Sequence, residues 1–224
     1  MERPIYIGFT VLELSKLCMY QFYYNVLKAK YGKNVELAYT DTDSLLVKIT
    51  TENIYKDMAE MAEHFDFSDY SKDHEVLKSL PEDQWKIENG KQILKNKKVP
   101  GLFKDEYNGK IIAEFIGLKP KMYSILKAGD DPLIPNPDPK VCYRKAKGVP
   151  KSLVKNEFNH ERYREVLHKK ILNDTVKFNT IRSEKHKIYT MEVVKVGCSP
   201  ICTKKYILSD GNHTYAFGDF RIKY

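Results

Sequence analysis

The sequence predicts an α+β fold, because hydrophobic residues recur at helical spacing in some segments and at alternate positions in others. At 224 residues, of which 42% are hydrophobic, the chain is long enough to bury a core in one large or two small modules. Prolines at positions 132, 135, 137 and 139 exclude regular structure between two such modules. We therefore expect a first module at residues 1–127, a proline-rich linker at 128–140 and a second module at 141–224.

The first expected element is a helix over residues 11–31. Thr10 and Glu13 have the spacing of a capping box at its start, and Gly32 is a typical stop. Hydrophobic residues then alternate in two short runs, 35–39 and 45–49. The alternation predicts a strand, a tight acidic turn and a returning strand, with Val35, Leu37 and Tyr39 on one face of the first.

The remainder of the first module is predicted to be less regular. Residues 52–65 have apolar side chains at helical spacing and predict a helix with one solvent-facing side. Residues 66–100 show no clear period and predict a loop-rich connection. Asn108-Gly109 is a strong two-residue turn signal, so we expect a second hairpin between residues 102–107 and 110–117.

The second module is predicted to mix helix and sheet. Apolar residues from Glu161 to Ile171 follow helical spacing, and residues 187–196 alternate as in a strand. Two further short strands are expected on either side of Asp210-Gly211.

The charge of the chain is unevenly distributed. The net charge is +8, and it divides into +1 over residues 1–50, −7 over 51–90 and +14 over 91–224. A long basic region suits a polyphosphate partner such as nucleic acid, because each neutralised phosphate releases counterions. A solvated lysine-rich surface, a membrane face or a ribosomal partner would have a similar charge.

No segment predicts membrane insertion or export. The first apolar stretch, residues 11–27, is interrupted by Glu13 and Lys16, so we expect a soluble, intracellular protein without membrane partners. The cysteines lack a familiar zinc-binding pattern and are expected to be free thiols: Cys18, Cys142, Cys198 and Cys202. Three histidines with charged neighbours are expected at the surface: His160, His168 and His186.

The acidic turn Asp41-Thr42-Asp43-Ser44 is a candidate metal site. Side chains two residues apart on an extended chain point the same way, about 6 to 7 Å apart at the backbone. Asp41 and Asp43 would then present two carboxylates, which suit Mg²⁺. Phosphoryl transfer with two metal ions would also need a carboxylate from elsewhere. The alternative is that both aspartates only satisfy backbone amides of the turn.

Residues 118–126 are a candidate DNA-binding strand. If they continue as an extended chain, one face carries polar side chains, Lys119, Lys121 and Tyr123. The other face carries apolar ones, Leu118, Met122 and Leu126. The polar face could hold a sugar-phosphate backbone without reading sequence, and Lys145 and Lys147 could extend it. A lysine-rich edge that discourages aggregation is the alternative.

The motif Tyr39-Thr40-Asp41-Thr42-Asp43-Ser44 resembles the Tyr-x-Asp-Thr-Asp-Ser signature of family B DNA polymerases. Lys121-Met122-Tyr123 resembles the Lys-x-Tyr motif of the protein-primed branch. Three further stretches are similar to polymerases of Polinton-type virus-like transposons: Gly8–Lys16, Phe103–Glu106 and Tyr206–Phe217. The resemblance therefore spans nearly the whole chain.

The resemblance implies a DNA-directed DNA polymerase, a nucleotidyltransferase of DNA replication. It implies that residues 1–127 form the end of the palm and 141–224 a thumb-like module. Asp43 would be the more direct Mg²⁺ ligand, Asp41 its companion, and Tyr39 would lie close to the incoming nucleotide. Implied partners are primer-template DNA, deoxynucleoside triphosphates and a terminal protein primer, in the nucleus or a virus-like replication site. Thr40 departs from the glycine that many members carry.

Two other motifs of the family are missing from this sequence: the earlier Asp-x-x-Ser-Leu-Tyr-Pro motif and the Lys-x-x-x-Asn-Ser-x-Tyr-Gly helix of the fingers. The two-metal site would therefore be only partly encoded, and we expect the isolated chain not to incorporate nucleotides. A non-catalytic DNA-binding remnant of a polymerase and a metal-dependent nuclease remain alternative hypotheses.

Overall fold

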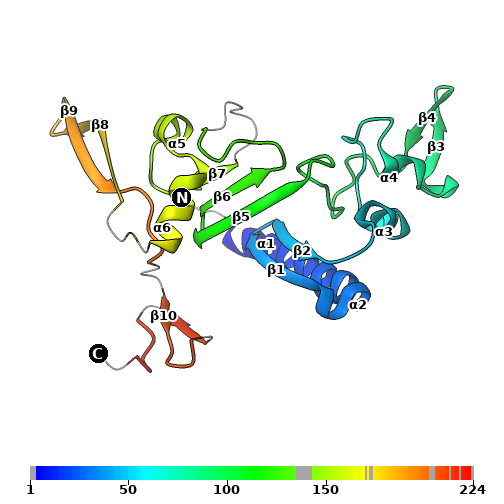
Figure 1. Ribbon diagram of the computed structural model, residues 1–224, viewed down its shortest axis with the longest axis horizontal. Coiled ribbons are helices and arrows are strands. Elements are labelled where there is room, and N and C mark those ends of the chain that lie inside the picture. The colour runs from blue at the N-terminus through cyan, green and yellow to red at the C-terminus, as the bar shows by residue number, and fades with distance from the viewer. Residues whose placement is uncertain are drawn as a thin grey trace. The chain divides into compact units, whose positions relative to one another are not determined.

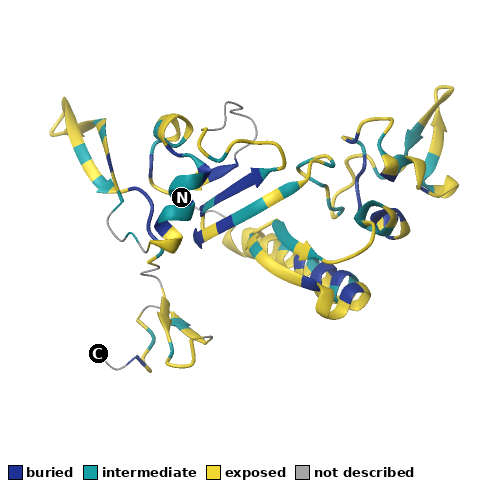
Figure 2. Ribbon diagram, viewed as in Figure 1, coloured by how far each residue is buried: buried dark blue, intermediate teal, exposed yellow. Residues whose placement is uncertain are grey.

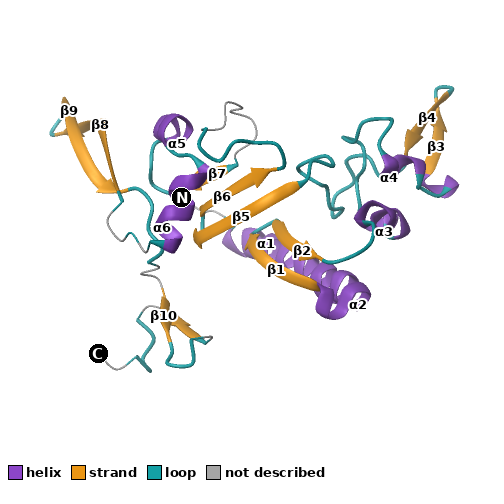
Figure 3. Cartoon of the chain, viewed as in Figure 1, coloured by secondary structure: helices purple, strands orange, loops and turns teal. Residues whose placement is uncertain are grey.

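The structure is a computed structural model that describes residues 4–134, 143–169, 171, 174–201, 205–211, 213–216 and 218–222. It divides into two compact units, Met1–Ile111 and Ile112–Tyr224. Both units combine helices with small antiparallel sheets, which confirms the predicted α+β class (Figure 3). Within the described residues, every helix is too short or too polar to cross a bilayer.

The first unit consists of a long helix, two β-hairpins and several short helices (Figure 1). Its elements are α1 (Ile5–Gln21), η1 (Phe22–Leu27), α2 (Lys28–Tyr31), η2 (Gly32–Asn34), β1 (Val35–Asp41), β2 (Ser44–Ile49), α3 (Ile54–Glu60), η3 (Ala62–His64), α4 (Glu75–Lys78), η4 (Glu82–Gln84), β3 (Trp85–Glu88) and β4 (Lys91–Leu94).

The predicted first helix starts too late. Helical structure begins at Ile5, directly after Pro4, and continues through the π-helical η1 to Tyr31. Thr10 Oγ1 donates to the carbonyl of Tyr6 at 2.8 Å, inside the helix, so no capping box forms. Proline is well suited to the start of a helix because its φ is fixed and it lacks an N–H. The predicted end is confirmed, since Gly32 has φ +54.

Aromatic side chains form the centre of the first core. The ring of Phe22 stacks on Phe103, with 3.8 Å between centroids, and meets Phe65 edge-on at 5.6 Å. The burial of the second half of the long helix is visible in Figure 2. The helix expected over 52–65 is shorter, because α3 ends at Glu60 and is followed by the separate turn η3.

A hairpin occurs where the sequence predicted only a loop. Strands β3 and β4 pair from Trp85 opposite Leu94 to Glu88 opposite Lys91. Asn89 and Gly90 connect them with φ values of +53 and +71, which is the backbone of a tight hairpin turn. The short strands contain too few alternating residues to have been recognised from periodicity.

The hairpin predicted around Asn108-Gly109 is wrong. Residues 102–107 do not form a strand, and the Asp105 carboxylate holds the turn instead. It accepts hydrogen bonds from the backbone N–H of Tyr107 at 2.8 Å and of Gly109 at 2.7 Å. Asn108-Gly109 therefore reverses the chain within a loop that a side chain organises.

Among its described residues, the second unit contains a three-stranded antiparallel sheet, two helices and two separate ribbons. Its elements are β5 (Ile112–Lys119), β6 (Met122–Lys127), β7 (Arg144–Ala146), α5 (Lys151–Glu157), α6 (His160–His168), β8 (Thr175–Glu184), β9 (Lys187–Val196), β10 (Lys205–Ile207) and β11 (Thr214–Ala216). The strand predicted at 187–196 and the two expected around Asp210-Gly211 are confirmed, and α6 matches the predicted helix apart from its ends.

The compact units divide before β5 and not at the expected linker, 128–140. Strand β7, which follows that segment, pairs with β6, so that Tyr123 lies opposite Lys145. The sheet and helix α6 then share one hydrophobic core. Strands β5 and β6 therefore group with the residues that follow them. Residues 135–140 of the expected linker lie outside the described residues, as do Cys142 and Cys202.

Candidate functional site

The acidic turn lies at the tip of a hairpin that is anchored to the first core. Strands β1 and β2 pair from Val35 opposite Ile49 to Asp41 opposite Ser44. Val35 is 1% exposed, and Val47 and Ile49 pack against the same core. The hydrophobic strand ends thus hold the hairpin while its polar tip is left accessible.

A β-bulge interrupts the first strand of this hairpin. The register shifts between Leu37 and Tyr39, so that Tyr39 lies opposite Leu46. Val35 is buried, Leu37 is 43% exposed and Tyr39 is half-buried. Val35 and Leu37 keep a common face in this register, but Tyr39 leaves it, because an extra residue in one strand breaks the alternation after Leu37.

The turn brings the two aspartates together at the backbone. Asp41 is the last residue of β1, and the N–H of Asp43 donates to the Asp41 carbonyl at 2.6 Å. Thr42 between them has φ +51, a strained conformation for a β-branched residue. Asp43 thus belongs to the turn, and the side-chain spacing of an extended strand does not apply to the pair.

The donor atoms at this tip fit a hard divalent cation. Asp41 is half-buried and Asp43 is exposed, and carboxylate oxygens are ligands that Mg²⁺ prefers. Among the described residues, no three histidine, cysteine, aspartate or glutamate side chains are grouped closely enough to hold a metal ion. A two-metal centre at this tip would therefore need a carboxylate from outside that set.

The candidate DNA-binding segment turns back on itself instead of continuing as one strand. Strands β5 and β6 are joined at Pro120-Lys121, where Lys121 has φ +58, so the extended chain expected over 118–126 is wrong. Its expected apolar side is nevertheless buried, at Leu118, Met122 and Leu126.

The structure brings the predicted basic residues together around the beginning of β6. Tyr123 is paired with Lys145 across the strands, and the Lys147 N–H donates to the Lys121 carbonyl at 3.0 Å. Lys119 donates to the carbonyl of Ile201 at 3.4 Å. Lys121, Lys145 and Lys147 are exposed, whereas Lys119 and Tyr123 are half-buried. The five residues therefore contribute to one region of the second unit.

His160 is a buried residue that the sequence prediction placed at the surface. It is 0% exposed, its Nδ1 lies 2.7 Å from Ser124 Oγ, and its Nε2 lies 3.3 Å from Glu114 Oε2. Arg164 pairs with the same Glu114 carboxylate. His160 precedes the buried Tyr163 by three positions, so helical spacing could have indicated its burial. His168 and His186 are exposed as expected.

The buried histidine predicts acid sensitivity of the second unit. Burial lowers the pKa of His160 from its ordinary 6.5, against the opposing effect of Glu114. At a pH between the lowered pKa of the folded state and 6.5, the histidine takes up a proton when the protein unfolds. The stability present above pH 6.5 is therefore lost as the pH falls. We expect His160→Gln to flatten this dependence, whose slope is at most about 1.4 kcal/mol per pH unit.

Hydrogen exchange of the β6 amides between pH 7 and 5 measures this effect. Glu114 titrates separately, because Arg164 holds the pKa of its carboxyl below 4.5 and its contribution is lost only below that value. An equal pH slope for the wild type and the variant would refute the assignment to His160.

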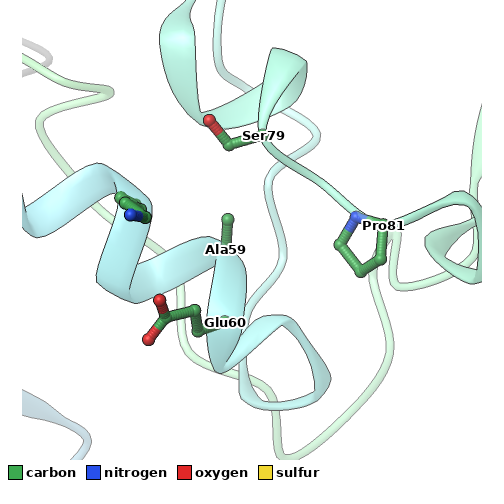
Figure 4. Close-up of a pocket in the computed structure, with 5 residues that line it drawn as sticks. Ala59, Glu60, Ser79 and Pro81 are labelled. Atoms are coloured by element: carbon green, nitrogen blue, oxygen red, sulfur yellow. The ribbon is translucent and has the colours of Figure 1, made fainter.

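An open hollow of about 370 Å³ lies elsewhere in the first unit, beside α3 (Figure 4). It is lined by Lys56, Ala59, Glu60, Ser79 and Pro81. None of the predicted site residues lines it, so the hollow does not contribute to the acidic site.

Comparison with protein-family models, with curated proteins and with solved structures gives no match to this chain. A functional assignment therefore depends on the sequence motifs and on the geometry of the hairpin.

Proposed function

We propose that this chain is part of a family B DNA-directed DNA polymerase, which transfers nucleotides to a primer hydroxyl under the direction of a template. The observation that supports this most directly is the position of the Tyr39–Ser44 motif. It lies on an anchored hairpin whose tip carries Asp41, which is half-buried, and Asp43, which is exposed. In this proposal residues 1–127 are the end of the palm, and residues 141–224 are a thumb-like module.

Each candidate residue has a role in this reaction. Asp43, with Asp41 beside it, holds Mg²⁺, and Tyr39 contacts the incoming deoxynucleoside triphosphate. When bound, the cation supplies electrostatic stabilisation of the attacking and leaving oxygens. Lys119, Lys121, Lys145 and Lys147 neutralise phosphates of the primer-template, and Tyr123 contacts the same strand. A terminal protein would provide the priming hydroxyl in the protein-primed branch.

The charge of the second unit supports a nucleic-acid partner. Residues 112–224 contain 22 lysines and arginines against 12 aspartates and glutamates, a net charge of +10. Such an excess strengthens binding to DNA through counterion release, independently of sequence. Phosphate contacts of this kind position a duplex without specifying its bases, as a replicative enzyme requires.

The second candidate function is a DNA-binding remnant of a polymerase without catalytic activity. This function requires only the basic region, and it needs neither a metal ion nor the family motifs that the sequence lacks. The same basic region would then bind DNA, while the acidic tip would have no catalytic role.

Primer extension in the presence of a second polypeptide distinguishes the two functions. That polypeptide should carry the missing aspartate motif and fingers helix of a similar polymerase. We expect the mixture to extend a labelled primer with Mg²⁺, and each component alone to be inactive. A stable complex of the two polypeptides that never extends the primer would refute the catalytic proposal and leave the remnant.

A further inference from the structure

One side of the three-stranded sheet of the second unit is buried, and the opposite side is partly exposed near the beginning of β6, although Ile125 on that side is only 7% exposed. Ile116, Leu118 and Met122 point into the core shared with α6 and are less than 10% exposed. Because side chains alternate along a strand, Phe115 and Tyr123 belong to the opposite side, and both are half-buried. We call this side, with Lys145, the aromatic face.

Phe115 and Tyr123 form a ring pair on the aromatic face. Their centroids are 5.9 Å apart and their planes are tilted by 45°. Gly117 lies directly opposite Tyr123, and a Cβ atom there would be 3.0 Å from Cε1 and Cζ of Phe115. The ring of Phe115 therefore lies over Gly117, and any larger residue would displace it.

Two lysines lie next to the ring pair in the backbone, one on the neighbouring strand and one in the adjacent turn. Lys145 is the cross-strand partner of Tyr123, and it is exposed. Lys121 lies in the turn that precedes β6, and its carbonyl accepts from the N–H of Lys147 at 3.0 Å. Lys121 and Lys145 are thus neighbours of Tyr123 along the chain and across the strands.

We propose that the aromatic face binds single-stranded DNA, with an unpaired base stacked on Phe115 and Tyr123 and the neighbouring phosphates held by Lys145 and Lys121. Proteins that bind single strands combine base stacking on aromatic rings with a basic path for the backbone. In a duplex the base faces are already stacked and only their edges are accessible. The inference rests on the proposed function for the choice of DNA, and it adds Phe115 and Gly117 to the binding residues.

Fluorescence anisotropy of labelled thymidine oligonucleotides, about 12 nucleotides long, tests the proposal with the full chain in EDTA. A second oligonucleotide of equal length lacks the bases and keeps the phosphates. We expect Phe115→Ala to weaken binding of the normal oligonucleotide about tenfold or more. The same variant should bind the abasic oligonucleotide as the wild type does, because no base remains to stack.

Two further variants separate stacking from charge and from folding. Phe115→Leu preserves an apolar side chain over Gly117 but removes the flat ring, so it should resemble Phe115→Ala in binding while keeping wild-type circular dichroism. Lys145→Ala should weaken binding of both oligonucleotides equally. It should also reduce the slope of log affinity against log salt concentration by the amount that corresponds to about one phosphate contact.

Equal effects of Phe115→Ala on the normal and abasic oligonucleotides, or no effect on either, would overturn the stacking proposal. If strong salt-dependent binding persists in those cases, the proposed polymerase function stands without the stacking site. If no salt-dependent binding to any DNA is found, both the stacking proposal and the proposed DNA contact of the second unit are wrong.

Discussion

Asp43→Asn is expected to lower primer extension by the complemented chain about a thousandfold or more. A bound metal ion contributes several kcal/mol of transition-state stabilisation, and each 1.36 kcal/mol corresponds to a factor of ten in rate. Asparagine has nearly the same size as aspartate and can occupy the same turn, but it lacks the charge that holds the cation. Single-turnover extension with saturating nucleotide measures the loss at the chemical step.

A matched substitution controls for effects on folding. Asp73 is also an exposed aspartate of the first unit and is not part of the hairpin, so Asp73→Asn should extend primers at the wild-type rate. Both variants should unfold within about 0.5 kcal/mol of the wild type, as is usual for exposed positions. If Asp43→Asn retains wild-type extension, the assigned metal role is wrong.

Gly109→Ala is expected to destabilise the first unit by about 3 kcal/mol, the combined effect of backbone strain and a steric clash. Gly109 has φ +82, and a Cβ atom would lie 2.3 Å from Nε2 of His74. The His74 ring has little freedom to move, because it lies 4.6 Å from the rings of both Tyr55 and Tyr70. Its Nδ1 also accepts the N–H of Val76 at 3.2 Å.

Urea unfolding followed by tryptophan fluorescence measures this loss, because Trp85 is the single tryptophan of the chain and packs against the core of the first unit. Gly90→Ala is the matched control. Gly90 has φ +71 but no atom within 4 Å of an added Cβ, so only the strain of about 1 kcal/mol should be observed. An equal decrease in the free energy of unfolding for the two variants would show that the His74 ring moves away from the new methyl group without cost.

The sequence predicted secondary structure best where a regular spacing of hydrophobic residues ended at a recognisable turn. The hairpin around Asp41 and Asp43 has strong alternation on both sides of a short polar turn, and residues 187–196 form a strand as predicted. Asn108-Gly109 misled the prediction because the same turn chemistry serves a loop held by Asp105. The start of the long helix was missed because Thr10 and Glu13 match a cap but lie within helical structure.

The candidate site was predicted in part. Its charged residues were recognisable from the motifs, and Lys121, Tyr123 and Lys145 do lie together. The contribution of Phe115 and Gly117 depends on the register of β5 against β6, which the turn at Pro120-Lys121 determines. The burial of His160 depends similarly on partners 36 and 46 positions away, Ser124 and Glu114. Long-range pairing of this kind has no local sequence signal.

The pairing of β7 with β6 determines where the polypeptide can be divided for separate expression. A truncation at the proline cluster would give a carboxy-terminal fragment in which β7 lacks its neighbouring strand and His160 lacks Ser124. The buried surface of α6 in that fragment would be left facing water. Dividing the polypeptide between Ile111 and Ile112 leaves every one of these partners on the same fragment.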